Sequence, residues 1–211
     1  MTKKSSRRQF LKTGTSVGLG LALGGTPPTV SASQRQSGAA NEINLPPIDK
    51  VRIGIIGMGG RGNSLMGNFL QMKADVEIRA VCDIYPERAK AAQERVIRAG
   101  FNKPEVYSGN KNIWKKLVER EDLDAVIIAT YWQWHTPMAV YTMKAGKYAA
   151  SEVPIAYTLE ECWELVNTSE QTGIPCMMLE NWSFRSDNLA VLNMIRKGLL
   201  GKIMHCHCAH S

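Results

Sequence analysis

A glycine-rich turn between a short apolar run and a helical pattern constrains this chain of 211 residues more than any other feature. Residues 53–56 are apolar and predict a buried strand, and the turn GMGGRG follows at residues 57–62. Residues 63–70 then repeat large apolar side chains at helical spacing. Strand, glycine turn and helix in this order form the fingerprint of a dinucleotide-binding domain.

Each glycine of the pattern has its own physical reason. Gly57 makes the tight turn, Gly59 lets a pyrophosphate approach the backbone, and Gly62 lets the helix pack on the strand. The phosphates would then lie on unpaired N–H groups at the positive end of a helix. The pattern alone is weak evidence, and the alternative is a glycine-rich turn with no ligand.

An acid at the end of the next apolar run supports the dinucleotide interpretation. Residues 75–83 alternate, turn apolar and finish on Asp83, about 26 residues after Gly57. At about this spacing a carboxylate accepts hydrogen bonds from the adenosine ribose hydroxyls. A carboxylate there also repels a 2′-phosphate, so NAD is favoured over NADP. The alternative for Asp83 is a helix cap before Pro86.

Strand patterns alternate with helix patterns through the rest of the chain, which predicts an α/β fold with a doubly wound parallel sheet of the Rossmann type. We expect a nucleotide-binding domain over residues 49–180 and the start of a second α/β domain over 181–211. Further strands are expected at 124–130, 147–152, 175–179 and 201–209, and helices at 86–99, 110–119, 137–144, 158–172 and 189–199.

Basic residues gather at the beginning of the chain. Five Lys or Arg and no acid precede residue 32, so subtracting 5 from the formal net charge of +7 leaves +2 for the remainder. Net charge therefore gives no support for nucleic-acid binding.

The basic segment resembles a twin-arginine export signal. Residues 6–12 read SRRQFLK, a mild apolar stretch at 17–25 is too short to span a bilayer, and 30–32 offer small residues for a signal peptidase. We expect a signal peptide over 1–32 and a linker over 33–48, recognition by the twin-arginine export machinery, and a periplasmic or extracellular protein without a stable membrane anchor. The alternative is a disordered basic tail.

Polar and aromatic residues cluster at the predicted strand ends, where parallel sheets bind ligands. These clusters are YWQWH at 131–135, EVP at 152–154 and ENW at 180–182. For single residues the alternatives are packing of the tryptophans, helix capping by His135, and solvation of Glu152 and Asn181.

These stretches carry a resemblance to a known family. The run VCDIYPERA at 81–89, the strand at 125–130 and the Glu-x-Pro turn at 152–154 resemble the Gfo/Idh/MocA family of NAD(P)-dependent sugar enzymes, over nearly all of residues 50–211. Most of that family has Lys where this chain has Val153. The segments 132–135, 152–154, 161–165 and 177–181 are more similar to glycoside hydrolase family 109.

Family 109 hydrolyses α-N-acetylgalactosaminides and keeps NAD tightly bound. In its cycle, hydride leaves sugar carbon 3, the aglycone is eliminated, water adds and hydride returns, so no net redox occurs. The resemblance implies a sugar or glycoside substrate, and NAD contacts from Gly60, Arg61, Asp83, Trp132, Gln133, Trp134, His135, Glu152, Val153 and Asn181.

The resemblance also suggests catalytic residues. We expect Glu152 and His210 to be catalytic residues. His210 stands where the family has a sugar-contacting Tyr, and an imidazole transfers protons near neutral pH. The family usually has Tyr at Phe184 as well. A net sugar oxidoreductase and a non-catalytic dinucleotide-binding module stay open as alternatives, and so does a homo-oligomer.

The last residues, HCHCAHS at 205–211, raise the question of a metal site. Cysteines at alternate positions differ from the usual Cys-x-x-Cys zinc spacing, so we expect no metal. The family continues with a large open-faced sheet domain, and we expect this chain to hold only its beginning.

Overall fold

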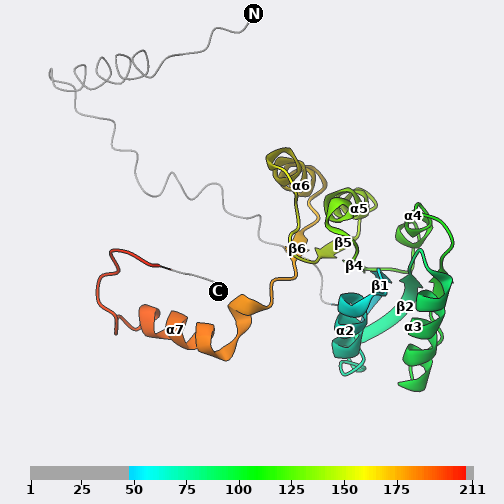
Figure 1. The fold of residues 1–211 in the computed structure, drawn as a ribbon, viewed down its shortest axis with the longest axis horizontal. Coiled ribbons are helices and arrows are strands. Elements are labelled where there is room, and N and C mark those ends of the chain that lie inside the picture. Colours follow the sequence, from blue (N-terminus) through cyan, green and yellow to red (C-terminus); the bar gives the residue numbers. More distant parts are fainter. Residues whose placement is uncertain (1–47, 208–211) are drawn as a thin grey trace, which may run out of the picture. The chain divides into compact units, whose positions relative to one another are not determined.

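A computed structural model describes residues 48–207, which contain a six-stranded sheet with the strand order β3-β2-β1-β4-β5-β6 (Figure 1). Every neighbouring pair of strands is parallel. The predicted α/β fold with a doubly wound parallel sheet is therefore confirmed. The strands are β1 (Val51–Ile56), β2 (Val76–Cys82), β3 (Glu105–Tyr107), β4 (Ala125–Ile128), β5 (Tyr148–Ser151) and β6 (Cys176–Met178).

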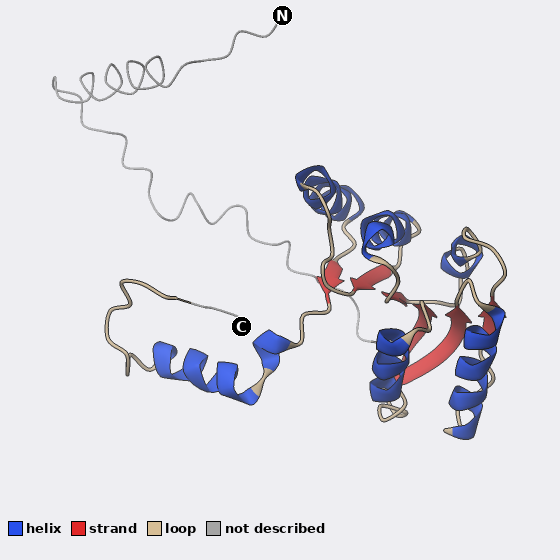
Figure 2. Cartoon of the chain, viewed as in Figure 1, coloured by secondary structure: helices blue, strands red, loops and turns tan. Residues whose placement is uncertain are grey.

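Helices cover both faces of this sheet (Figure 2). Helices α2 and α3 pack on one face with Ile53 and Ile55 of β1, whereas α4, α5 and α6 pack on the other face with Ile56. Both faces of the central strands are thus buried, which explains their continuous apolar sequence. The helices are α2 (Gly60–Phe69), α3 (Pro86–Arg98), α4 (Trp114–Val118), α5 (His135–Lys144), α6 (Leu159–Thr172) and α7 (Ser186–Arg196), with short 3₁₀ helices η2 (Trp132–Trp134) and η3 (Trp182–Phe184).

The strand order reverses direction at β1. The chain moves from β1 to β2 and β3 on one side, then returns to place β4, β5 and β6 on the other. A crevice opens at such a switch point beyond the carboxyl ends of the strands, and it is where open α/β sheets bind ligands. The fold therefore directs attention to the residues that follow β1, β2 and β4.

Local capping signals correctly predicted α6. The Thr158 hydroxyl accepts a hydrogen bond from the Glu161 N–H at 3.2 Å, and the Glu161 carboxylate accepts one from the Thr158 N–H at 3.2 Å. Gly173 ends the helix in the left-handed conformation, with φ of 68°. The two hydrogen bonds between Thr158 and Glu161 satisfy backbone N–H groups that have no acceptor within the helix.

Other elements were less predictable from the sequence. Strand β3 was not expected, because it has only three residues and pairs at the sheet edge. The helix expected over 110–119 is shorter, since only α4 within it is helical. The prediction of a strand over 201–209 is wrong for the described part, because residues 201–207 form no strand.

Much apolar surface is exposed on the last helices. In α6 only Leu165 and Thr168 are buried, whereas Trp163 is 60% exposed. Helix α7 has no buried residue at all. Of the helices in residues 48–207, none is both long and apolar enough to cross a membrane.

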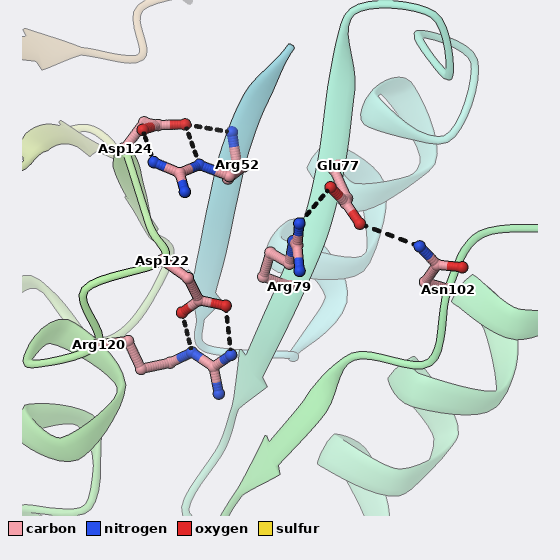
Figure 3. Close-up of polar contacts among 7 residues, drawn as sticks. All are labelled: Arg52, Glu77, Arg79, Asn102, Arg120, Asp122 and Asp124. Atoms are coloured by element: carbon pink, nitrogen blue, oxygen red, sulfur yellow. Dashed lines mark hydrogen bonds and ion pairs between the residues drawn. The ribbon is translucent and has the colours of Figure 1, made fainter.

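Ion pairs support the sheet near the beginnings of its strands (Figure 3). The Asp124 carboxylate, just before β4, accepts hydrogen bonds from Arg52 of β1 at the backbone N (2.8 Å), Nε (2.9 Å) and Nη2 (2.6 Å). The Arg52 guanidinium holds the pKa of the Asp124 carboxyl below its ordinary value. Arg120 does the same for Asp122, through a hydrogen bond of 2.7 Å.

Replacing Asp124 by Asn removes the negative partner of Arg52. We expect the free energy of unfolding at pH 7 to fall by about 1 kcal/mol. The folded-state pKa of Asp124 is lowered, so this stabilisation is present above the unfolded pKa of about 3.9 and is lost as pH falls through the folded value. Urea unfolding of wild type and D124N should therefore differ less at about pH 3 than at pH 7.

The matched control is E121Q, which changes the same charge at an exposed site nearby. This variant should unfold like the wild type at both pH values. A difference between wild type and D124N that does not change with pH would contradict the assignment of the stabilisation to the ion pair.

Candidate functional site

A cavity of about 330 Å³ lies beyond the carboxyl ends of β1, β2 and β4. It occupies the switch point of the sheet, where the predicted glycine turn and Asp83 come together. Its walls combine glycines, aromatic rings, cations and one acid. The lining includes Gly57, Gly59, Gly60, Arg61, Asp83, Tyr85, Arg88, Lys111, Thr130, Tyr131 and Trp134.

The glycine turn packs too tightly for side chains at two positions. Gly57 has φ of 92°, and a Cβ there would lie 2.4 Å from the Ala129 carbonyl oxygen. A Cβ on Gly62 would lie 1.8 Å from the Gly57 carbonyl oxygen, so α2 can start this close to β1 only with glycine. The reasons predicted for the first and third glycines are therefore visible in the structure.

The middle of the turn is open instead. A Cβ on Gly60 would meet nothing within 4 Å, and one on Gly59 would meet only Arg88 Nη1, at 4.0 Å. Helix α2 begins there without a side-chain cap and without an acid in its first turn. The first N–H groups of a helix have no intrahelical acceptor, so this end presents donors and positive potential to the cavity. A dinucleotide diphosphate fits this cradle by shape and by charge.

Asp83 ties the turn to the end of β2. It is 6% exposed, its Oδ2 accepts a hydrogen bond from the Met58 N–H at 2.7 Å, and its Oδ1 accepts one from the Tyr85 N–H at 2.9 Å. Tyr85, and not Asp83, is the N-cap residue of α3. Each carboxylate oxygen accepts more than one hydrogen bond, so Asp83 retains capacity for ribose hydroxyls at the cavity wall.

An ion pair joins the glycine turn to the loop after β5. Arg61 Nε lies 2.7 Å from Glu152 Oε1, and the Glu152 side chain is 12% exposed. The second oxygen, Oε2, accepts a longer hydrogen bond of 3.3 Å from the Val153 N–H. Two residues predicted for the site from sequence segments 91 positions apart are therefore in direct contact.

His135 is buried, and both of its ring nitrogens face backbone carbonyls. Nδ1 lies 2.7 Å from the Pro154 oxygen and Nε2 lies 3.1 Å from the Thr130 oxygen, with 1% of the residue exposed. The ring thereby links the end of β4 to the loop after β5. Its predicted contact with NAD stays a prediction, and its visible role is to hold this rim together.

The other predicted residues divide between the cavity and its surroundings. Trp134 lines the cavity, whereas Trp132, Gln133, Val153 and Asn181 are exposed outside the lining. The Trp132 ring lies 6.2 Å from the Tyr157 ring, between centroids. His210 lies outside the described residues, so its catalytic role stays a prediction, as do the cofactor contacts of the exposed residues.

Several lining residues were missed by sequence reasoning. Tyr85 is the N-cap residue of the helix after Asp83, and Arg88 lies in the first turn of that helix. Lys111 comes from the loop after β3, a strand that was itself not expected. The available signal was an Arg five residues after Asp83, in the first turn of the helix that follows it.

The thiol and metal chemistry of this region is limited. Burial raises the pKa of the Cys82 thiol, at the cavity wall, to about 12, so the thiol is protonated at neutral pH. Within residues 48–207, no three His, Cys, Asp or Glu side chains are arranged to hold a metal ion.

A pair of glycine substitutions tests the packing of the turn. G62A should lower the free energy of unfolding by about 3 kcal/mol or more, because its Cβ would overlap the Gly57 carbonyl oxygen. G60A should stay within about 0.5 kcal/mol of wild type, because its Cβ meets open space. Urea unfolding of both variants measures the difference, and equal stabilities would contradict the close approach of α2 to β1.

Known proteins resemble the chain in both sequence and fold. A glycosyl hydrolase family 109 protein of Shewanella pealeana is 40% identical to it over 211 residues, which cover 98% of this chain and 46% of that protein. An α-N-acetylgalactosaminidase of Shewanella oneidensis is 40% identical over 209 residues, covering 97% of this chain and 45% of that protein. The chain thus spans a little under half the length of these curated relatives.

A solved structure and a family model agree with this similarity. The WlbA dehydrogenase of Bordetella pertussis, determined in complex with NADH and UDP-GlcNAcA, has a TM-score of 0.63 and 22% identity, covering 72% of this chain and 44% of that chain. The model of the Gfo/Idh/MocA oxidoreductase family, with its NAD-binding Rossmann fold, matches residues 51–179. This match confirms the family resemblance and NAD as the cofactor of the fold. The chain belongs to the Gfo/Idh/MocA oxidoreductase family.

Proposed function

We propose that this chain binds NAD and forms the nucleotide-binding part of a sugar-converting enzyme, a family-109-like glycosidase that oxidises sugar carbon 3 transiently. The observation that carries the proposal is the cradle at the start of α2, open above Gly59 and Gly60 and fixed from below by Asp83. The curated relatives at 40% identity support the glycosidase over other reactions of the family.

The fold places residues suited to each part of NAD in the order in which those parts follow one another in the cofactor. The N–H groups at the start of α2 would receive the diphosphate, and Asp83 would accept hydrogen bonds from the adenosine ribose. Arg61, beside this cradle, pairs with Glu152 at the end of β5. The nicotinamide end would accordingly lie toward Trp134 and the loop that holds Glu152.

Bound NAD would supply a reversible hydride acceptor, so a sugar hydroxyl at carbon 3 could be oxidised and later restored. In this proposal Glu152 accepts the proton of that hydroxyl on Oε2 and later returns it. Oε2 is the carboxylate oxygen that is not paired with Arg61. Arg61 keeps the carboxylate at the rim, and His135 keeps the loop of Glu152 next to the end of β4. His210 is proposed as a second proton-transfer group, by its resemblance to the family position.

The second candidate function is a net sugar oxidoreductase. The family model describes oxidoreductases, and hydride transfer to NAD is common to both reactions. The two differ in their products, since a glycosidase releases an aglycone and leaves NAD oxidised. An oxidoreductase accumulates NADH.

We also propose that residues 1–32 direct export through the twin-arginine route, with a periplasmic or extracellular location. The twin-arginine pattern at residues 6–12 supports this proposal. That route carries folded proteins, so an enzyme could acquire NAD in the cytoplasm before crossing. These residues lie outside the part that the structure describes.

The proposed function is tested by binding and turnover in the full-length gene product. The purified protein should carry NAD, and calorimetry on protein stripped of that NAD should show NAD binding. As purified, it should release the aglycone of a chromogenic α-N-acetylgalactosaminide without added NAD and without net NADH. NADH formed from a free sugar, with no aglycone release, would replace the glycosidase by the oxidoreductase. The absence of NAD binding would refute the proposal altogether.

Glu152 can be tested separately by E152Q, which keeps the shape of the side chain but cannot take up the proton. We expect kcat for aglycone release to fall by about 100-fold or more. E164Q is the matched control, because Glu164 is an exposed acid on α6 away from the cavity, and it should keep wild-type activity. Undiminished kcat in E152Q would exclude Glu152 as the proton-transfer group.

A further inference from the structure

Two cations at the cavity wall, Arg88 and Lys111, have no acid partner among the described residues. Arg88 lines the cavity, and in residues 48–207 its guanidinium makes neither a hydrogen bond nor an ion pair. Arg61, by contrast, is paired with Glu152. A guanidinium carries five N–H donors in a planar fork, a geometry that matches phosphate oxygens in pairs.

An aromatic ring holds Arg88 in place. Its guanidinium carbon lies 4.6 Å from the centroid of the Tyr85 ring, within the range of a cation–π contact. The Tyr85 N–H is in turn bound by Asp83 Oδ1 at 2.9 Å, and the Arg88 N–H donates to the Tyr85 carbonyl at 3.1 Å. The position of Arg88 is therefore set by the same carboxylate that fixes the glycine turn.

Arg88 also reaches across to the start of α2. Its Nη1 is the one heavy atom of the described chain within 4 Å of where a Cβ of Gly59 would stand, beyond the neighbouring residues of the turn. Gly59 is the N-cap residue of α2 and the second glycine of the pattern, where a pyrophosphate is able to approach the backbone. Arg88 and the α2 N–H groups thus face the same space from two helices.

We propose that Arg88 is a phosphate-binding residue that closes the diphosphate cradle opposite the start of α2. The proposal rests on the NAD binding proposed above and adds a side-chain contact to a cradle otherwise made of backbone. A 2′-phosphate is a second possible source of the same chemistry. The diphosphate is favoured because Arg88 lies beside Gly59, and because the buried Asp83 carboxylate would repel a 2′-phosphate.

The test compares ligands that differ in their phosphates. Dissociation constants of NAD, NADP and ADP are measured by calorimetry and that of adenosine by ligand-observed NMR, on protein stripped of copurified NAD, for wild type, R88A and R88K. R88A should raise the dissociation constants of NAD and ADP by about tenfold and leave that of adenosine unchanged. R88K retains the charge but lacks the planar set of guanidinium donors, so its dissociation constants for NAD and ADP should lie between those of wild type and R88A.

R98A is the matched control. Arg98 is an exposed cation in the last turn of α3 that does not line the cavity, so this variant should bind every ligand like wild type. Arg88 is exposed too, so both variants should keep the wild-type midpoint of unfolding. Affinity for NAD should also depend less on salt in R88A than in R98A, since one charged contact is lost.

Four outcomes would overturn the proposal. Unchanged affinities in R88A would remove Arg88 from the site, and equal losses for ADP and adenosine would place it against the base. A loss confined to NADP would assign it to a 2′-phosphate. Failure of wild type to bind NAD would overturn the proposed function itself, which separates that result from the other three.

Discussion

The site depends on the contact between the start of α2 and the end of β1. With no side chain at Gly62, the helix approaches the Gly57 carbonyl directly, and Asp83 holds the turn between them through the Met58 N–H. This approach points the free N–H groups of α2 into the cavity. A larger residue at Gly62 would move the helix and the positive potential that it carries, so the cradle exists only as long as that contact does.

The residues predicted best were those whose role follows from local geometry. Gly57 and Gly62 are needed because a side chain there would overlap the backbone, and the glycine pattern in the sequence predicts this requirement. Asp83 follows a strand at a spacing that is typical of the fold. The direction of the exposed side chains was less predictable. Trp132 lies outside the cavity and Trp134 lines it, a difference fixed by the 3₁₀ helix η2 that their sequence did not signal.

Elements stabilised mainly by distant partners were the least predictable from the sequence. Strand β3 exists because β2 pairs with it, and its three residues carry too little pattern to be found alone. Arg88 was missed for a related reason, since its place beside Gly59 depends on how α3 packs next to α2. By contrast, α6 was predicted because its capping box and Gly173 are self-contained.

The place of His135 between two backbone carbonyls affects how mutations at this rim should be interpreted. A substitution there would release the loop after β5 from the end of β4, and Glu152 would move with it. Lost cofactor affinity in such a variant would then resemble the loss of a ligand contact, although the movement of this loop would account for it without one. An alanine scan of this rim would score His135 among the direct ligands, and a structure of the variant would be needed to separate scaffold from contact.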